Sequence, residues 1–278
     1  MDAPFIRPSK IGEMRDLLFE LLQEHRRDDT IPTNARFLYY ELLMRRVLSK
    51  QQTGARRSDQ IVHDALIDLR EIGRIPWDWI VDETRTIEDY TGHPTILDGV
   101  LATLPHITLD PWRAQAPLIL TESRSLAGVL RAIAREHRAR IASTNGQVGG
   151  FLRTDVAPLL WPNATVLYLG DYDLSGNQIE DNTRRVLERE VGPLNWERLA
   201  LTREQIDAYD LAVIIRTDRR YRDGRPHEAV ETEAISQRVL IEVLREYLTK
   251  LLPEPLARVQ EREARQRRRL EQLLRGAP

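Results

Sequence analysis

The alternation of short apolar strands with helices between residues 116 and 190 is the feature that most limits how this chain can fold. Apolar runs of strand length occur at 117–121, 140–143 and 165–169. The segments that follow them carry apolar residues at helical spacing. Because parallel strands need a long crossover, usually a helix, this order predicts βαβ units around a mainly parallel sheet. We therefore expect an α/β fold here, with two further strands near 199–201 and 212–215.

The N-terminal part carries a different pattern, in which helices precede an extended segment. Helical apolar spacing predicts three helices, over 11–27, 34–49 and 58–73. Thr33 or Asn34 is suited to cap the second helix, and Gly73 to end the third. The segment from Pro76 to Val81 predicts a strand. Three helices and a strand in this order are typical of the winged helix, a helix-turn-helix variant that places a helix in the major groove of DNA.

Charge has to be judged by position, because 41 Lys and Arg against 43 Asp and Glu leave a net charge of only −2. Between residues 36 and 57, six cations accompany a single acid, Glu41. Most are arginines, whose planar fork suits phosphates. Five of them make up the predicted DNA-binding surface: Arg45, Arg46, Lys50, Arg56 and Arg57. The alternative is a solvated helix face followed by a basic loop.

The remaining segments divide the chain. Residues 83–113 are rich in turn formers and predict a linker with at most a short helix. Residues 235–275 have helical spacing, and their Arg-rich end has no strict apolar seam, which predicts a solvated helix or a partly disordered tail. DNA or partner binding is the alternative for this tail. We expect three regions: a winged-helix domain with its linker at 1–113, an α/β domain at 114–250 and a charged helical tail at 251–278.

The composition also limits where the protein functions. Zero cysteines exclude disulfides and thiolate zinc sites, and fit a reducing cytoplasm. No apolar run approaches the roughly 18–20 residues that cross a bilayer, and the N-terminus leads into no apolar signal core. We therefore expect a cytoplasmic protein with no membrane partner.

Three carboxylates follow the ends of the predicted strands. Glu122 follows the first strand, and Asp171 and Asp173 follow the third. Ligands of open parallel sheets bind beyond the carboxyl ends of the strands, so these side chains are expected to share one rim. Carboxylate oxygens are ligands for Mg²⁺, with Mn²⁺ as an alternative. The same carboxylates could instead only cap helices. Three further acids could support the rim: Asp218, Glu231 and Glu233.

The order of these motifs resembles the Toprim domain, in particular that of topoisomerase VI A subunits and their relatives among meiotic double-strand-break proteins. The matching stretches are Thr121-Glu122, Asn145-Gly146, Gly170-Asp171-Tyr172-Asp173 and Ser175-Gly176. In that family a winged-helix domain precedes the Toprim domain and holds an Arg followed by a paired aromatic and Tyr. Arg36-Phe37-Leu38-Tyr39-Tyr40 matches this motif, which places the nucleophile-equivalent at Tyr40. The resemblance covers roughly 30–235. Two later stretches, Thr217-Asp218-Arg219 and Val230-Glu231-Thr232-Glu233-Ala234, look like elements of the compact bacterial, plasmid and phage members.

The resemblance implies Mg²⁺-dependent cleavage of double-stranded DNA. Tyr40 would attack a phosphodiester and stay joined to the 5′ end, while Glu122, Asp171 and Asp173 hold the metal and Glu122 also moves a proton. A phenol is a weak nucleophile at pH 7, and Arg36, one helical turn earlier, is placed to activate it. In such proteins the tyrosine of one subunit meets the metal of the other, so a homodimer associated with the nucleoid is implied.

Other functions stay open at this point. Tyr40 could be a core aromatic of the winged helix, in which case the carboxylates would support hydrolysis by a metal-activated water, as in Toprim nucleases. The chain could also be a non-catalytic DNA-binding or partner-recruiting module. It contains no Walker-type Gly-rich loop, so strand passage would need a separate ATPase subunit.

Overall fold

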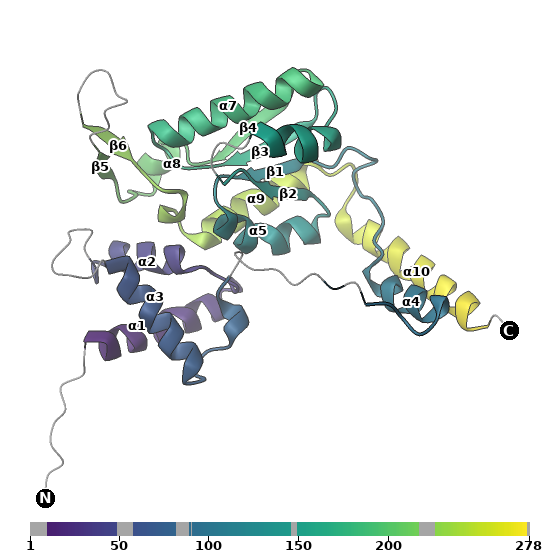
Figure 1. The fold of residues 1–278 in the computed structure, drawn as a ribbon, viewed down its shortest axis with the longest axis horizontal. Coiled ribbons are helices and arrows are strands. Elements are labelled where there is room, and N and C mark those ends of the chain that lie inside the picture. Colours follow the sequence, from purple (N-terminus) through teal and green to yellow (C-terminus); the bar gives the residue numbers. More distant parts are fainter. Residues whose placement is uncertain are drawn as a thin grey trace, which may run out of the picture.

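A four-stranded parallel sheet lies at the centre of the computed structural model, which describes residues 10–48, 58–81, 89, 91–145, 149–216 and 226–276 (Figure 1). The strand order is β2 (Arg140–Ser143), β1 (Leu118–Thr121), β3 (Thr165–Leu169) and β4 (Asn195–Ala200), and every neighbouring pair is parallel. The predicted α/β fold with a parallel sheet is therefore confirmed. The fourth strand starts at Asn195 rather than near residue 199.

Helices cover both faces of the sheet. α5 (Arg124–Glu136) and α9 (Gln237–Leu251) lie on one face, and α7 (Leu174–Val191) lies on the other (Figure 1). Successive strand residues point to opposite faces, so Ile119 belongs to the core with α5 and α9, whereas Leu118 and Leu120 belong to the core with α7. Because both faces of the central strands β1 and β3 are covered, these two strands are almost wholly buried and mostly apolar, whereas β2 and β4 are less buried and carry charged residues.

Three helices form a separate N-terminal unit around a core of their own: α1 (Lys10–Arg27), α2 (Ala35–Met44) and α3 (Ser58–Glu71). The Asn34 side chain caps α2 by accepting from the Phe37 N–H at 2.9 Å, and Gly73 follows α3 with a φ of 71°, both as predicted. Two residues of α2, Phe37 and Tyr40, connect the N-terminal unit to the unit that contains the sheet. Both are buried in the core that also contains residues of α5 and α9.

Two predictions for the N-terminal unit are wrong. α2 ends at Met44 instead of near residue 49, because Arg46 takes a left-handed φ of 58° and its N–H bonds back to the Leu43 carbonyl. The predicted strand at 76–81 is instead the 3₁₀ helix η1 (Trp77–Trp79), followed by a single parallel bridge between Thr33 and Ile80. Among the described residues, a 3₁₀ turn therefore lies where the winged-helix prediction placed a strand.

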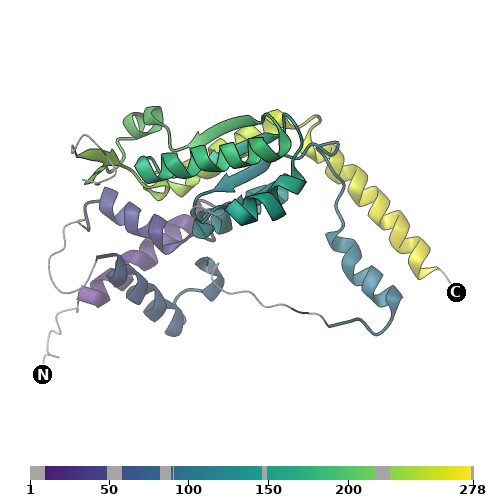
Figure 2. The same ribbon diagram turned by 45° about the horizontal axis from the view of Figure 1, so that its top comes forward.

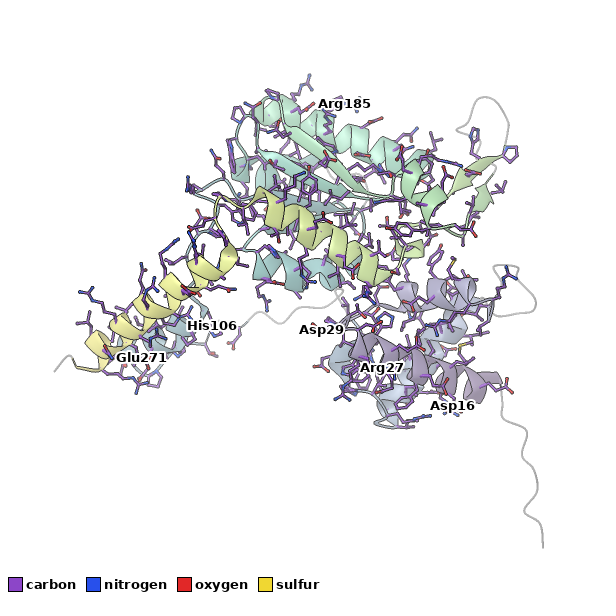
Figure 3. The ribbon with its side chains drawn as sticks, turned by 180° about the vertical axis from the view of Figure 1, so that it is seen from behind. Asp16, Arg27, Asp29, His106, Arg185 and Glu271 are labelled. Carbon is purple, nitrogen blue, oxygen red and sulfur yellow. The ribbon has the colours of Figure 1, made fainter. Side chains whose placement is uncertain are left out.

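A two-helix arm extends from the body of the molecule (Figure 2). It pairs α10 (Leu256–Arg275) with α4 (Ile96–Thr103) and with the 3₁₀ helix η2 (Leu104–His106). His106 and Glu271 are labelled at the same end of this arm in Figure 3. Glu263 fastens α10 by accepting from the Leu109 N–H at 2.9 Å and from Arg138 at 2.6 Å. The linker thus contains the expected short helix, and the described part of the tail is helical.

The remaining elements are short. They are α6 (Gly149–Phe151), the π-helical η3 (Leu152–Val156), η4 (Ala157–Leu159), α8 (Arg203–Ala208), η5 (Thr232–Ala234) and the antiparallel pair β5 (Ile214–Arg216) and β6 (His227–Ala229). Residues 149–159 form three short consecutive helical segments, with Pro158 in the last of them. The helix predicted over 235–275 is interrupted at 252–255, where two prolines occur. No helix in the described ranges is long and apolar enough to cross a membrane. The bounds of the three regions stay predictions.

Candidate functional site

Glu122 and Asp171 meet where the strand order of the sheet reverses. Glu122 follows β1 and Asp171 follows β3, which are neighbours, while β2 lies on the far side of β1. Ligands of open α/β sheets bind at such a switch point, beyond the carboxyl ends of the strands. The Asp171 N–H donates to Glu122 Oε2 at 3.0 Å. Gly176 permits this approach, because a Cβ there would lie 2.3 Å from the Asp171 carbonyl oxygen.

A cavity of about 200 Å³ opens at this point. Its lining comes from both units of the chain: Arg36, Glu122, Ser123, Leu126, Asn145, Asp171 and Thr232. Asn145 directly follows β2 and takes a positive φ of 44°, which Asn adopts more readily than most residues. The cavity therefore joins two carboxylates, a guanidinium and several hydrogen-bonding groups in one chain. The Gly146 of the matching motif lies outside the described residues.

The Asp171 carboxylate is held by the segment before α9. Thr232 donates to Asp171 Oδ1 twice, from its N–H at 2.8 Å and from its hydroxyl at 2.9 Å. The bridge between Tyr172 and Val230 adds two backbone hydrogen bonds. Burial raises the pKa of Asp171 above its usual value, although the Thr232 hydrogen bonds oppose this.

Asp173 is not among the residues that line the cavity, but its charge acts on Glu122. Its Oδ1 accepts from the Gly176 N–H at 2.7 Å, which makes it the N-cap of α7. The helix therefore begins at Leu174. Among the described residues, no group of three His, Asp or Glu side chains is arranged to hold a metal ion. Glu122 and Asp171 line the cavity, and the assignment of Asp173 as a third ligand stays a prediction.

The Glu122 carboxyl is unusually basic for a glutamate. Burial, followed by the negative charge of Asp171, raises its pKa to about 7. Near neutral pH this group is therefore divided between its protonated and ionised forms. A second negative charge, that of Asp173, acts on Glu122 in the same direction.

Arg36 connects α2 to two acids that the sequence indicated only as support for the rim. Its Nη2 lies 2.6 Å from Glu231 Oε2, and its Nη1 lies 3.9 Å from Glu233 Oε1. Burial lowers the pKa of Arg36, but the charges of Glu233 and Glu231 outweigh it and raise the pKa further above its usual range. Burial raises the pKa of Glu233 to about 6. The third such acid, Asp218, lies outside the described residues.

Tyr40 is 2% exposed. Burial and the negative charge of Glu231 raise the pKa of the phenol above its usual value of 10. Arg36 does lower the pKa of the phenol, as a neighbouring cation should, but burial and the charge of Glu231 outweigh it. The ring is also a core aromatic, packed edge-on against Tyr39 at 5.5 Å between centroids.

Arg198 is a residue of the site that the sequence analysis missed. It lies in β4, and its Nη2 donates to the carbonyls of Asp171 at 2.7 Å and Gly170 at 3.1 Å. Its Nε donates to the Leu201 carbonyl at 2.6 Å, and its Nη1 pairs with Glu180. An arginine within a half-buried strand beside the carboxylate rim is the signal that could have indicated this role.

The predicted DNA-binding residues are only partly described. Arg45 pairs with Glu24, through Nη1 at 3.2 Å and through Nη2. Arg46 is exposed at the end of α2 and makes no ion pair with the described residues. Lys50, Arg56 and Arg57 lie outside the residues that the structure describes.

Comparison with known proteins yields no relative. No protein-family model matches the chain, and no curated protein and no solved structure matches it. The motifs and the site geometry therefore carry any assignment of function.

Proposed function

We propose that this chain is a topoisomerase VI A-like protein, with a winged-helix and a Toprim domain, that cleaves duplex DNA in a divalent-metal-dependent reaction. The observation that supports this most is the convergence of Glu122, Asp171 and Arg36 on one cavity at the switch point of a parallel sheet. Carboxylates for a cation and a guanidinium for a phosphate are what phosphodiester cleavage requires.

Glu122 and Asp171 would hold Mg²⁺, with Mn²⁺ as the alternative. Two carboxylates suffice, because Mg²⁺ usually keeps several waters and takes further oxygens from a substrate phosphate. The charges of the site also fit a cation. Burial and the charge of Asp171 both disfavour the ionised form of Glu122 and raise its pKa to about 7, and a bound cation would stabilise that ionised form. When bound, the ion would stabilise negative charge on the phosphate and on the leaving oxygen.

The chain's own residues would then have separate tasks. Arg36 would bind the scissile phosphate, because its guanidinium faces the cavity and forms charge-assisted hydrogen bonds with phosphate oxygens. Tyr40 would attack the phosphorus and remain joined to the 5′ end of the cut strand. Glu122, whose pKa lies near neutrality, would exchange a proton with the leaving oxygen.

Hydrolysis by an activated water is the second candidate, and the burial of Tyr40 favours it. A ring that is 2% exposed cannot contact a phosphate until α2 or the ring moves. The carboxylates and Arg36 already line the cavity and need no such movement. The two reactions share the metal and differ in their product.

Partners and location complete the proposal. Double-stranded DNA would contact Arg45, Arg46, Lys50, Arg56 and Arg57, and a homodimer would cut both strands. Strand passage would require a separate ATPase subunit. We expect the protein in the cytoplasm, associated with the nucleoid.

The test is cleavage of supercoiled plasmid with Mg²⁺, quenched with denaturant. We expect protein covalently attached to 5′ ends in the wild type, no adduct with Tyr40→Phe, and no cleavage with Asp171→Asn. Asp181→Asn, a change at an exposed acid of α7, is the matched control. Free ends from an active Tyr40→Phe variant would favour hydrolysis. Salt-sensitive DNA binding without any cleavage would instead indicate a binding module.

A further inference from the structure

We propose that a second cavity, between α7 and η3, binds the phosphate backbone of a nucleic acid. Its volume is about 410 Å³, and its lining is Arg153, Asn182, Arg185, Val186 and Arg189. Among the described residues that line it, three carry a guanidinium and none is acidic. The inference is independent of the proposed cleavage, because this cavity shares no residue with the one that contains the carboxylates.

Helical spacing places four residues of the lining on one face of α7. Asn182, Arg185, Val186 and Arg189 follow one another at intervals that bring helix side chains together. Arg185 and Arg189 are one helical turn apart and carry like charges, an arrangement that destabilises an isolated helix. An anion bound between these two cations would remove the repulsion.

η3 supplies the third cation of this cavity. Leu152 and Val156 of η3 are buried in the same core as residues of α7, which fixes η3 against that helix. Between them in sequence, Arg153 is oriented by two contacts: its Nε donates to Glu190 Oε1 and its Nη1 donates to the Gly149 carbonyl, both at 3.1 Å. η3 is π-helical, and such segments are rare and frequently occur at functional sites.

The polar groups that line this cavity are mainly hydrogen-bond donors. Arg185 Nη2 donates to Asn182 Oδ1 at 2.7 Å, which occupies the amide oxygen and leaves the two N–H donors of that amide. The Arg189 guanidinium forms no ion pair or hydrogen bond with the described residues. Guanidinium groups stay charged and form strong, charge-assisted hydrogen bonds with phosphate oxygens. The donors and the charge of the lining are therefore complementary to phosphate.

The size and exposure of this cavity favour a chain of phosphates over a single ion. Arg153, Arg185 and Arg189 are all exposed, so an extended ligand can reach them. One water occupies about 30 Å³ of liquid, and a volume of about 410 Å³ therefore holds more than one phosphate group. Arg185 and Arg189 lie about 6 Å apart along the helix axis, close to the roughly 7 Å of duplex axis that two nucleotide steps cover.

This cavity lies away from the DNA-binding surface predicted for the N-terminal unit. Figure 3 labels Arg185 at the top of the view and Asp16, in α1, at the bottom. Along α7, Arg185 lies about 18 Å from Asp173, the residue that caps the helix beside the carboxylate rim. The two surfaces can therefore hold different segments of nucleic acid.

The test is protection of single arginines from phenylglyoxal by a short duplex without Mg²⁺, measured by peptide mass spectrometry. We expect the duplex to protect Arg189, and half-protection then reports binding at this cavity alone. Arg185→Ala should weaken that binding and reduce its slope of log K against log salt by about 0.9, the effect of one phosphate contact. Arg184→Ala is the matched control, because Arg184 has the same charge but pairs with Glu188 at 3.0 Å and is not among the lining residues. Circular dichroism checks that both variants are folded.

Three outcomes would overturn the assignment. Arg189 that stays reactive in the presence of duplex excludes a nucleic acid from this cavity. Equal weakening by Arg184→Ala and Arg185→Ala shows that DNA only coats a charged surface. Inorganic phosphate that protects Arg189 as well as the same concentration of duplex phosphate makes the cavity a site for a free ion. The Asp171→Asn variant, which we expect not to cleave DNA, should keep the protection, so failure of the proposed cleavage leaves this test intact.

Discussion

Glu122 and Asp171 are 49 residues apart in sequence and are joined by one hydrogen bond, in which the Asp171 N–H donates to Glu122 Oε2 at 3.0 Å. This bond ties the end of β1 to the end of β3 and places two carboxylates at the rim of one cavity. Burial, and after it the nearby negative charge of Asp171, raises the pKa of Glu122 to about 7.

Glu122 should make the metal-free protein less stable as the pH rises. Its pKa is 4.5 in the unfolded chain and about 7 in the folded one, so the folded state binds the extra proton. The stabilisation is complete below pH 4.5 and is lost as the pH rises through 7, by at most about 3 kcal/mol. Glu122→Gln should remove much of this slope. Chemical unfolding at pH 5 and pH 8 measures it, and an unchanged slope contradicts the pKa.

Mg²⁺ should stabilise the wild type at pH 8, where Glu122 is ionised, more than at pH 5.5. The reason is that a cation competes with protons for the same carboxylates. At a concentration 100 times the Kd the gain is about 2.7 kcal/mol. Thermal unfolding with and without Mg²⁺ provides the measurement, with Asp171→Asn as the variant that loses the effect. Equal stabilisation of Asp171→Asn and wild type would place the cation elsewhere.

The two roles of Asp173, cap and metal ligand, can be separated by two substitutions. Asp173→Ala should cost about 0.5–2 kcal/mol of stability, because α7 loses its N-cap. Asp173→Ser keeps a capping oxygen and should retain nearly all the stability. We also expect Asp173→Ser to keep its affinity for Mn²⁺, measured by electron paramagnetic resonance. Loss of Mn²⁺ binding in a stable Asp173→Ser variant would restore Asp173 as a ligand.

Arg198 should act on the cation through the backbone it holds. Arg198→Lys keeps the charge but cannot reach the carbonyls of Gly170, Asp171 and Leu201 with the same fork. We expect weaker Mn²⁺ binding in this variant, by about tenfold, which is within the range for partners that orient metal ligands. Guanidinium chloride unfolding serves as the control for a general loss of stability. If the Arg198→Lys variant binds Mn²⁺ as tightly as the wild type does, Arg198 only stabilises the sheet.

Arg46 should contribute more to DNA binding than Arg45. Arg45 must first leave Glu24, whereas Arg46 is exposed and has no ion pair with the described residues. Each phosphate contact changes the slope of log K against log salt by about 0.9, so Arg46→Ala should reduce the slope by about this amount. Fluorescence anisotropy on duplex DNA across a salt series measures the slope. If Arg45→Ala reduces the slope more than Arg46→Ala does, the prediction that Arg46 contributes more to DNA binding is wrong.

Local patterns in the sequence determined the parallel strands and the caps. The strand runs at 140–143 and 165–169 have the predicted bounds, and Asn34 caps α2, because apolar spacing and capping depend on residues near each other in the chain. The rim position of Glu122 and Asp171 also followed, since parallel strands place their carboxyl ends together. The segment after Pro76 was misjudged, because a run of aromatic and β-branched residues suits a strand and a turn alike.

Only the tertiary structure decided how the site is connected. Arg36 and Glu231 are 195 residues apart, and no pattern in the sequence states that α2 packs against the segment before α9. That packing buries Tyr40, and burial together with the charge of Glu231 raises the pKa of its phenol. The sequence by itself determined the residue types and the elements that carry them. Their distances and pKa values depend on burial and on charges brought together from distant parts of the chain, which exist only once the chain is folded.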